Sequence, residues 1–160
     1  MKVNASHIAE KLNELVCRRD ADMWRLDFEG LSPPDQVFLA IWELQSEVYN
    51  GGLLQYFSNF SGRLVPFIGE ALRAIGAHQI VSIVERAVAL VGAGVPWDDE
   101  VKRWTIISGL QEQTRDRIYD LDRQINVHID DLIVSLFYYL SEHREQVDAP
   151  PEFWTEATIQ

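Results

Sequence analysis

"NGGLLQYFSNFSG", residues 50–62, holds the stop signal and the apolar pattern that decide between a helical and a β fold for this chain. An Asn-Gly pair between alternating apolar residues is typical of a β-hairpin. Here large apolar side chains recur instead at i, i+3, i+4 and i+7, the spacing of a helix: Leu53, Tyr56, Phe57 and Phe60. A glycine just past a helix end commonly terminates the helix. The stretch therefore predicts two helices that meet at Gly51-Gly52, with at least one glycine at positive φ.

Helical spacing dominates the rest of the chain as well. The run Ser32-Pro33-Pro34-Asp35 predicts a helix start, because serine can cap, proline suits the first position and an acid stands three residues after the cap. Val95-Pro96-Trp97-Asp98 predicts another start, with Asp98 as the cap. The expected helices are one near residues 8–16 and then 33–49, 53–60, 65–75, 77–91, one from residue 98, 110–125 and 127–146.

The segments without this spacing are short. Residues 20–31 are polar and irregular, which predicts a connecting loop. The tail from Asp148 contains Pro150-Pro151 and is expected to be extended and docked through Phe153 and Trp154. The predicted fold class is therefore all-α, a compact single domain over residues 1–160 with about seven or eight helices.

The composition limits the kind of partner. A length of 160 residues with 47% apolar content fits one domain with a packed core. The formal net charge of −11 weighs against direct binding of nucleic acid or of an anionic membrane. The single cysteine, Cys17, excludes an internal disulfide and a multi-cysteine metal site. The first residues lack the apolar core of a signal peptide, and the longest apolar run, 132–140, is too short to span a bilayer, so we expect a cytoplasmic protein.

Most of the excess negative charge lies in the last two fifths of the chain. Residues 98–160 hold 14 acidic and 6 basic side chains, against 11 and 8 in residues 1–97. Acids at 112, 116 and 120 recur every four residues opposite an apolar stripe, and like charges at this spacing repel by roughly 0.2–0.5 kcal/mol per pair. Two interpretations stay open: a surface that binds a partner, or a solvated face. The candidate partner-binding acids are Asp98, Asp99, Glu100, Glu112, Asp116, Asp120 and Asp122.

Catalytic and metal-binding motifs are weak in this sequence. His7 precedes Glu10 by three positions and His128 precedes Asp131 by three, so two helix faces each offer a histidine–carboxylate pair. No H-E-x-x-H, nucleophile-elbow, Walker A or dinucleotide motif accompanies them. We therefore expect no catalytic residue and no cofactor. We also expect no metal at any of the four histidines, which are His7, His78, His128 and His143.

Glu43 and Glu47 stand one helical turn apart on the helix that leads into Asn50. In a cleft they would make an acid–base pair, and on the surface they would be an ordinary charged row. The exposed row is the simpler expectation, because no other feature of the sequence asks for an enzyme.

Two longer stretches resemble a known family. "SEVYNGGLLQYFSN" (46–59) and "EALRAIGA" (70–77), with "LD" at 121–122 and "YYLSEH" at 138–143, are similar to a bacterial family known as DNA-mimic proteins, first catalogued as a domain of unknown function. The resemblance covers about residues 30–145, and Leu53 stands where the family more often has Phe. The matching positions are Glu47, Val48, Asn50, Gly51, Gly52, Gln55, Tyr56, Phe57, Asn59, Ala71, Leu72, Ile75, Gly76 and Ala77.

The resemblance implies an all-α fold. It also implies, by the example of one family member, an acidic homodimer that imitates the charge of duplex DNA and removes a transcriptional repressor from its operator. The matched block itself is interpreted as structural: two glycines permit a sharp joint, and nearby amide side chains are expected to satisfy the loose backbone groups there. The residues of this structural motif are Asn50, Gly51, Gly52, Gln55, Tyr56 and Asn59.

Three functions stay open on these grounds. The first is a non-enzymatic regulator whose acidic face binds a basic DNA-binding protein in transcription regulation. The second is a cytoplasmic adaptor or immunity-type module that binds a protein through apolar and aromatic residues, with charge serving solubility. The third is a metal-dependent enzyme that uses His128 and its neighbours. Salt-sensitive capture of DNA-binding proteins favours the first, salt-insensitive capture of an unrelated partner the second, and bound metal the third.

Overall fold

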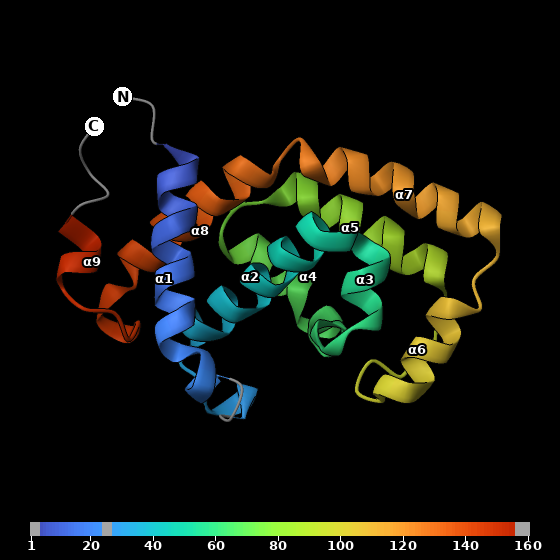
Figure 1. The fold of residues 1–160 in the computed structure, drawn as a ribbon, viewed down its shortest axis with the longest axis horizontal. Helices are drawn as coiled ribbons and strands as arrows, with labels where there is room; N and C mark the ends of the chain where they lie inside the picture. Colours follow the sequence, from blue (N-terminus) through green and yellow to red (C-terminus); the bar gives the residue numbers. More distant parts are fainter. Residues whose placement is uncertain (1–3, 24–26, 156–160) are drawn as a thin grey trace.

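The computed structural model describes residues 4–23 and 27–155, and all the secondary structure assigned within them is helical (Figure 1). This confirms the all-α prediction. The described ranges hold nine α-helices, one more than the expected upper bound, because the tail adds a single-turn helix. The α-helices are α1 (Ala5–Met23), α2 (Pro33–Gly51), α3 (Leu53–Ser58), α4 (Val65–Ala74), α5 (His78–Val91), α6 (Glu100–Ser108), α7 (Glu112–Asn126), α8 (Ile129–Glu142) and α9 (Glu152–Thr155). Three 3₁₀ helices join them: η1 (Phe28–Gly30), η2 (Phe60–Leu64) and η3 (Arg144–Gln146).

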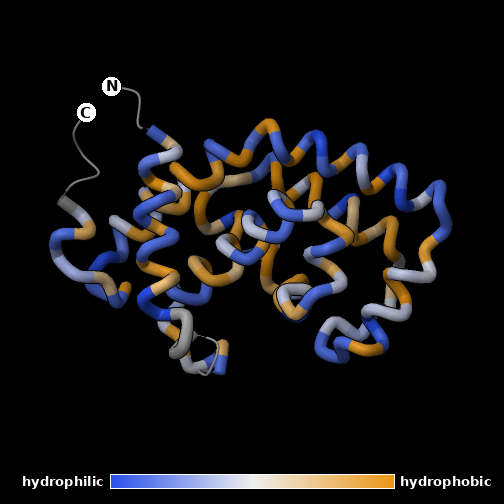
Figure 2. The backbone as a smooth tube through the Cα atoms, viewed as in Figure 1, coloured by the Kyte–Doolittle hydropathy of each residue, from blue (hydrophilic) through white to orange (hydrophobic). Residues whose placement is uncertain are grey.

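The centre of the fold is α2, which packs against α3, α4, α7 and α8. Its side chains Phe38, Ile41 and Leu44 are fully buried. In Figure 1, α1, α8 and α9 lie at one end of the molecule, while α5 and α7 run side by side toward the other end, where α6 lies below α7. Figure 2 shows α7 mostly in hydrophilic colours along the outer edge. No helix among the described residues combines the length and the apolar character needed to cross a membrane.

The end of α1 and the cap of α6 differ from the predictions. α1 continues to Met23, so the backbone of residues 20–23 is helical where a loop was expected. The chain has no glycine or proline between residues 5 and 29, and polar residues alone do not stop a helix. The second difference is the cap of α6, which is Asp99 and not Asp98. The Asp99 carboxylate accepts the N–H of Lys102 at 3.0 Å, three residues on, whereas Asp98 stands one residue too early.

The C-terminal segment is also more ordered than an extended tail. The predicted helix 127–146 is α8 followed by η3, and the chain then turns so that Val147 is buried. Phe153 is buried too, as expected, but on the short helix α9. Lys11 Nζ donates to the backbone carbonyl of Phe153 at 2.7 Å, and Arg19 donates to the carbonyl of Asp148. Basic side chains of α1 therefore hold the tail against the domain.

The predicted joint between α2 and α3 is confirmed. α2 ends at Gly51, α3 begins at Leu53, and Gly52 between them has φ 87° and ψ −174°, a region that is essentially restricted to glycine. The Gly52 N–H closes α2 by donating to the carbonyls of Glu47 and Val48, both at 3.1 Å. One glycine thus ends a long helix and starts the next.

A carboxylate from α7 caps α3 at this joint. The N–H of Leu53 donates to Asp122 Oδ1 at 2.7 Å, across 69 residues of sequence. A Cβ placed on Gly52 would lie 2.4 Å from Asp122 Oδ2, so the contact leaves no room for a side chain at residue 52. Gly52 is therefore required twice, once by its backbone angles and once by the approach of Asp122.

Arg103 of α6 holds the other end of α3. Its side chain is 1% exposed, and it donates from Nε to the carbonyl of Phe57 at 2.8 Å and from Nη2 to the carbonyl of Asn59 at 2.7 Å. Nη1 donates to the carbonyl of Trp97. Phe57 lies in the last turn of α3, where carbonyls lack helical partners and a cation is favoured, while the carbonyl of Asn59 also accepts the N–H of Gly62 at 2.9 Å. The guanidinium joins α6 to α3 without a carboxylate partner.

Gly52→Ala is expected to lower the free energy of unfolding by more than Gly76→Ala does. Gly76 also has positive φ, at 76°, but a Cβ there would meet no atom within 4 Å, so its replacement costs only the backbone term of about 1–2 kcal/mol. At Gly52 the collision with Asp122 and the disturbed cap add about 1 kcal/mol or more. Urea denaturation with matched m-values measures both. Equal losses at the two glycines would contradict the Asp122 contact.

Arg103→Met is expected to lower the free energy of unfolding by about 2 kcal/mol, because the carbonyls of Phe57, Asn59 and Trp97 each lose a side-chain donor and the Phe57 bond is buried. Lys102→Met on the same helix is the matched control. The Lys102 side chain is 72% exposed, so its replacement should stay within about 0.5 kcal/mol. Chemical denaturation of both variants tests this, and similar stabilities for the two would show that the carbonyl contacts do not hold α3.

Candidate functional site

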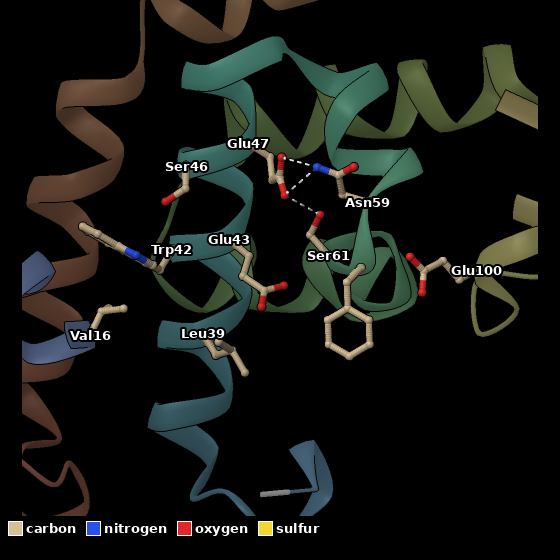
Figure 3. Close-up of a pocket in the computed structure, with 10 residues that line it drawn as sticks. Val16, Leu39, Trp42, Glu43, Ser46, Glu47, Asn59, Ser61 and Glu100 are labelled. Atoms are coloured by element: carbon tan, nitrogen blue, oxygen red, sulfur yellow. Dashed lines mark hydrogen bonds between the residues drawn. The ribbon is translucent and has the colours of Figure 1, made fainter. Parts of the chain in front are cut away.

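The amide side chains of the Asn-Gly-Gly block (residues 47–59) converge on Glu47. Gln55 Nε2 donates to Glu47 Oε2 at 2.6 Å, and Asn59 Nδ2 donates to the two carboxylate oxygens at 3.0 and 3.2 Å. Ser61 Oγ adds a longer bond of 3.4 Å (Figure 3). All these donors are neutral, so Glu47 is held in one position by uncharged groups.

This arrangement differs from the role predicted for the block. Gln55 and Asn59 were expected to satisfy loose backbone groups at the joint, whereas their side chains bind Glu47 and the backbone cap comes from Asp122. Asn50 is exposed at the end of α2. Tyr56 is fully buried, and its hydroxyl has no hydrogen-bond partner in the part of the chain that the structure describes. Burial raises the pKa of this phenol.

Glu47 forms part of the wall of a pocket on the face of α2 (Figure 3). The pocket has a volume of about 450 Å³. α2 contributes most of its wall, α1 closes one side, and η2, the residue before it and α6 face it from the other side. The lining residues are Val16, Leu39, Trp42, Glu43, Ser46, Glu47, Asn59, Phe60, Ser61 and Glu100.

Glu43 is buried, and the prediction of an exposed Glu43–Glu47 row was wrong for this residue. Its exposed fraction is 5%, and its Oε2 accepts from Arg63 Nη1 at 3.1 Å. Its Oε1 is buried without a hydrogen-bond partner among the described groups. Burial raises the pKa of this carboxyl, and the nearby Arg63 partly opposes that rise. Sequence spacing missed the burial because Arg63 covers Glu43 from η2, twenty residues away.

Most of the acids predicted to bind a partner are exposed near one end of the molecule. Asp98 precedes α6, and Glu100 is its first residue. Glu112, Asp116 and Asp120 lie on the outer side of α7, opposite its buried residues Ile118, Leu121 and Ile125. Asp120 pairs with Arg123 on the same helix, while Glu112 and Asp116 make no ion pair with any other residue that the structure describes. We call these five acids the α6–α7 acidic surface.

The two other predicted acids have local structural roles. Asp99 caps α6 and pairs with Lys102 at 3.2 Å, and these hydrogen bonds lower the pKa of its carboxyl. Asp122 points to the joint, where burial raises the pKa of its carboxyl and the Leu53 N–H opposes the rise. We therefore leave both out of the α6–α7 acidic surface.

Burial removes more positive than negative charge from the surface. Among the side chains that the structure describes, three bases are buried, Lys11, Arg19 and Arg103, and two acids, Asp35 and Glu43. Lys11 and Arg103 donate to backbone carbonyls, so no acid is neutralised by them. Among the described side chains, burial therefore removes one positive charge more than it removes negative charges.

The two histidine–carboxylate pairs seen in the sequence, His7 with Glu10 and His128 with Asp131, are not part of a larger group of metal-type ligands among the described residues. His78 and His128 line a pocket of about 380 Å³ at the starts of α5 and α8, together with Asp131. His7 is exposed on α1, and His143 lies against the ring of Tyr139 after α8. Within residues 4–23 and 27–155, the described His, Cys, Asp and Glu side chains form no group of three or more that suits a metal ion.

One comparison with known proteins assigns the chain to a family. A family model described as DMP19-like protein matches residues 29–143, from η1 to the residue after α8. The matched range is more than two thirds of the chain and includes Gly52, the α3 cap Asp122 and the α6–α7 acidic surface. Searches of curated proteins and of solved structures found no match. The family model agrees with the resemblance seen in the sequence, and the chain belongs to the DMP19-like family of DNA-mimic proteins.

Proposed function

We propose that this protein is a non-enzymatic regulator that imitates the charge of duplex DNA and occupies the DNA-binding surface of a basic protein such as a transcriptional repressor. Membership of a DNA-mimic family supports this role. The main support is the charge of the surface. The chain has 25 acidic and 14 basic side chains, and among the described ones three bases and two acids are buried. Such a surface attracts a DNA-binding protein over a distance and orients it.

We propose that the partner binds at the α6–α7 acidic surface. Acids one turn apart on α7 are separated by about 6 Å along the helix, whereas one strand of B-DNA has a phosphate every 3.4 Å or so. The row on α7 alone therefore has roughly half the charge density of a strand. Asp98 and Glu100 before and on α6 add to it, and a homodimer would double the surface offered to a partner.

The arginines of α7 modify this surface without covering it. Arg123 pairs with Asp120, and Arg115 donates to the carbonyl of Ser108 at 2.8 Å. Glu112 and Asp116 stay available for a partner's lysines and arginines. We therefore place the strongest contact at the first two turns of α7 and at the start of α6.

The triple variant Glu112→Gln, Asp116→Asn, Asp120→Asn is expected to lose binding to DNA-binding proteins. The immobilised protein is incubated with a bacterial lysate at low salt, and bound proteins are eluted with a short DNA duplex. The proposal predicts that the duplex elutes DNA-binding proteins and that physiological salt weakens their capture, because exposed charges are screened beyond about 8–10 Å. The variant should capture few of them.

A control variant tests whether the position of the acids matters, or only the total charge of the protein. The triple variant Glu10→Gln, Glu14→Gln, Glu70→Gln removes the same number of charges from exposed positions on α1 and α4. It should capture the same proteins as the unmodified chain, and so should Asp122→Asn, whose side chain faces the joint. Equal losses in both triple variants, or captured proteins that duplex DNA does not elute, would contradict the proposal.

An adaptor role is the second candidate, and one observation favours it. α6 exposes Val101 and Trp104, which are 75% and 58% exposed and lie three residues apart on one face. Exposed apolar patches of this kind mark protein-binding sites in other proteins. Capture that resists salt, is not eluted by duplex DNA and disappears in Trp104→Ser would favour the adaptor.

A further inference from the structure

The pocket on α2 contains a buried acceptor that lacks a donor. Glu43 is 5% exposed, and Arg63 reaches only its Oε2, at 3.1 Å. Oε1 has no hydrogen-bond partner in the described chain, although buried polar atoms nearly always have one. Glu43 is part of the wall of a pocket of about 450 Å³, so a group bound there can donate to this enclosed oxygen once the carboxylate turns toward it.

The charges around the pocket favour a cation. Three carboxylates line it, from Glu43, Glu47 and Glu100, and the guanidinium of Arg63, which lies over the ring of Phe60, pairs with Glu43. The hydrogen bonds to Glu47 come from neutral side chains, so these donors add no positive charge beside its carboxylate. The described wall contains no lysine, arginine or histidine. A ligand that brings positive charge and hydrogen-bond donors therefore complements the site.

The shape and the other walls favour an organic cation over a metal ion. Trp42 and Val16 lie on the side of the pocket away from Glu100, and Leu39 lies next to Glu43, so the wall is partly apolar (Figure 3). An indole ring also attracts a cation placed over its face. The oxygens of Glu47 already accept bonds from amide and hydroxyl donors, which leaves them poorly suited to a metal. A guanidinium group is planar, weakly hydrated and rich in donors, so it suits both the ring and the open oxygen. The volume falls in the usual range of small-ligand pockets, about 300–1,000 Å³.

We infer that the pocket between α1, α2, η2 and α6 binds an alkyl guanidinium group, with Glu43 Oε1 as its hydrogen-bond acceptor, Glu47 and Glu100 as its counter-charges and Trp42 as its apolar wall. The group is carried either by a small amine such as agmatine or by an arginine side chain of a protein. The inference goes beyond the proposed function, because the site is on the face of α2 and its key acid is not part of the α6–α7 acidic surface.

Isothermal titration calorimetry with three probes tests the chemistry and the source of the group. The probes are agmatine, the peptide acetyl-Gly-Arg-Gly-amide and the same peptide with citrulline, which is a neutral isostere of arginine. Agmatine or the arginine peptide should bind saturably, and the citrulline peptide should bind at least about tenfold more weakly. Tighter binding of agmatine points to a free amine, and tighter binding of the arginine peptide points to a protein side chain.

Two variants and one control locate the site. Glu43→Gln should weaken the binding of the guanidinium probes about tenfold or more, while Glu70→Gln removes one exposed charge elsewhere and should leave it within about twofold. Ser46→Arg places a guanidinium of the chain itself at the pocket wall and should abolish binding, which decides the matter if Glu43→Gln does not fold. Absence of saturable binding, equal binding of the two peptides, or undiminished binding by both pocket variants would overturn the inference.

Discussion

The Leu53 N–H donates to Asp122 Oδ1 at 2.7 Å, and the position of α3 depends on this bond. The first amides of a helix have no partner within it, so a buried start of α3 needs an acceptor from elsewhere. α7 supplies that acceptor, and the approach is possible only because residue 52 is glycine. With Arg103 at the opposite end, α3 is held at both termini by side chains from distant helices. Between these ends, α3 packs against α2, α6 and α7 through its buried side chains Leu53, Tyr56 and Phe57.

Local patterns predicted the fold well because they depend on neighbours in the chain. The spacing of Leu53, Tyr56 and Phe57 and the glycines before them were enough to place the joint. Long-range contacts were not predictable in the same way. Asp122 was predicted to be one of the partner-binding acids, since nothing in the neighbouring sequence indicates that it faces residue 53.

The burial of Glu43 was missed for the same reason. Two acids one helical turn apart, Glu43 and Glu47, suggest a solvated helix face. The contact with Glu43 comes from Arg63 of η2, twenty residues later in the chain. The residues of the Asn-Gly-Gly block have structural roles: Gly52 forms the joint, and the side-chain amides of Gln55 and Asn59 bind Glu47. These contacts lie within the fold, which explains why the block alone does not reveal the partner. The proposed function depends on a different property, the excess of exposed acids over exposed bases.

Displacement of DNA tests the central claim most directly. A fluorescent duplex is bound to a DNA-binding protein that this chain captures, the chain is titrated in, and the anisotropy of the duplex is followed at two salt concentrations. If the chain takes the place of DNA on its partner, the anisotropy falls to the value of free DNA. More of the chain is needed at higher salt, because exposed charges are screened. Anisotropy that stays constant, or that rises because the chain joins the protein–DNA complex, would contradict the claim that the chain takes the place of DNA.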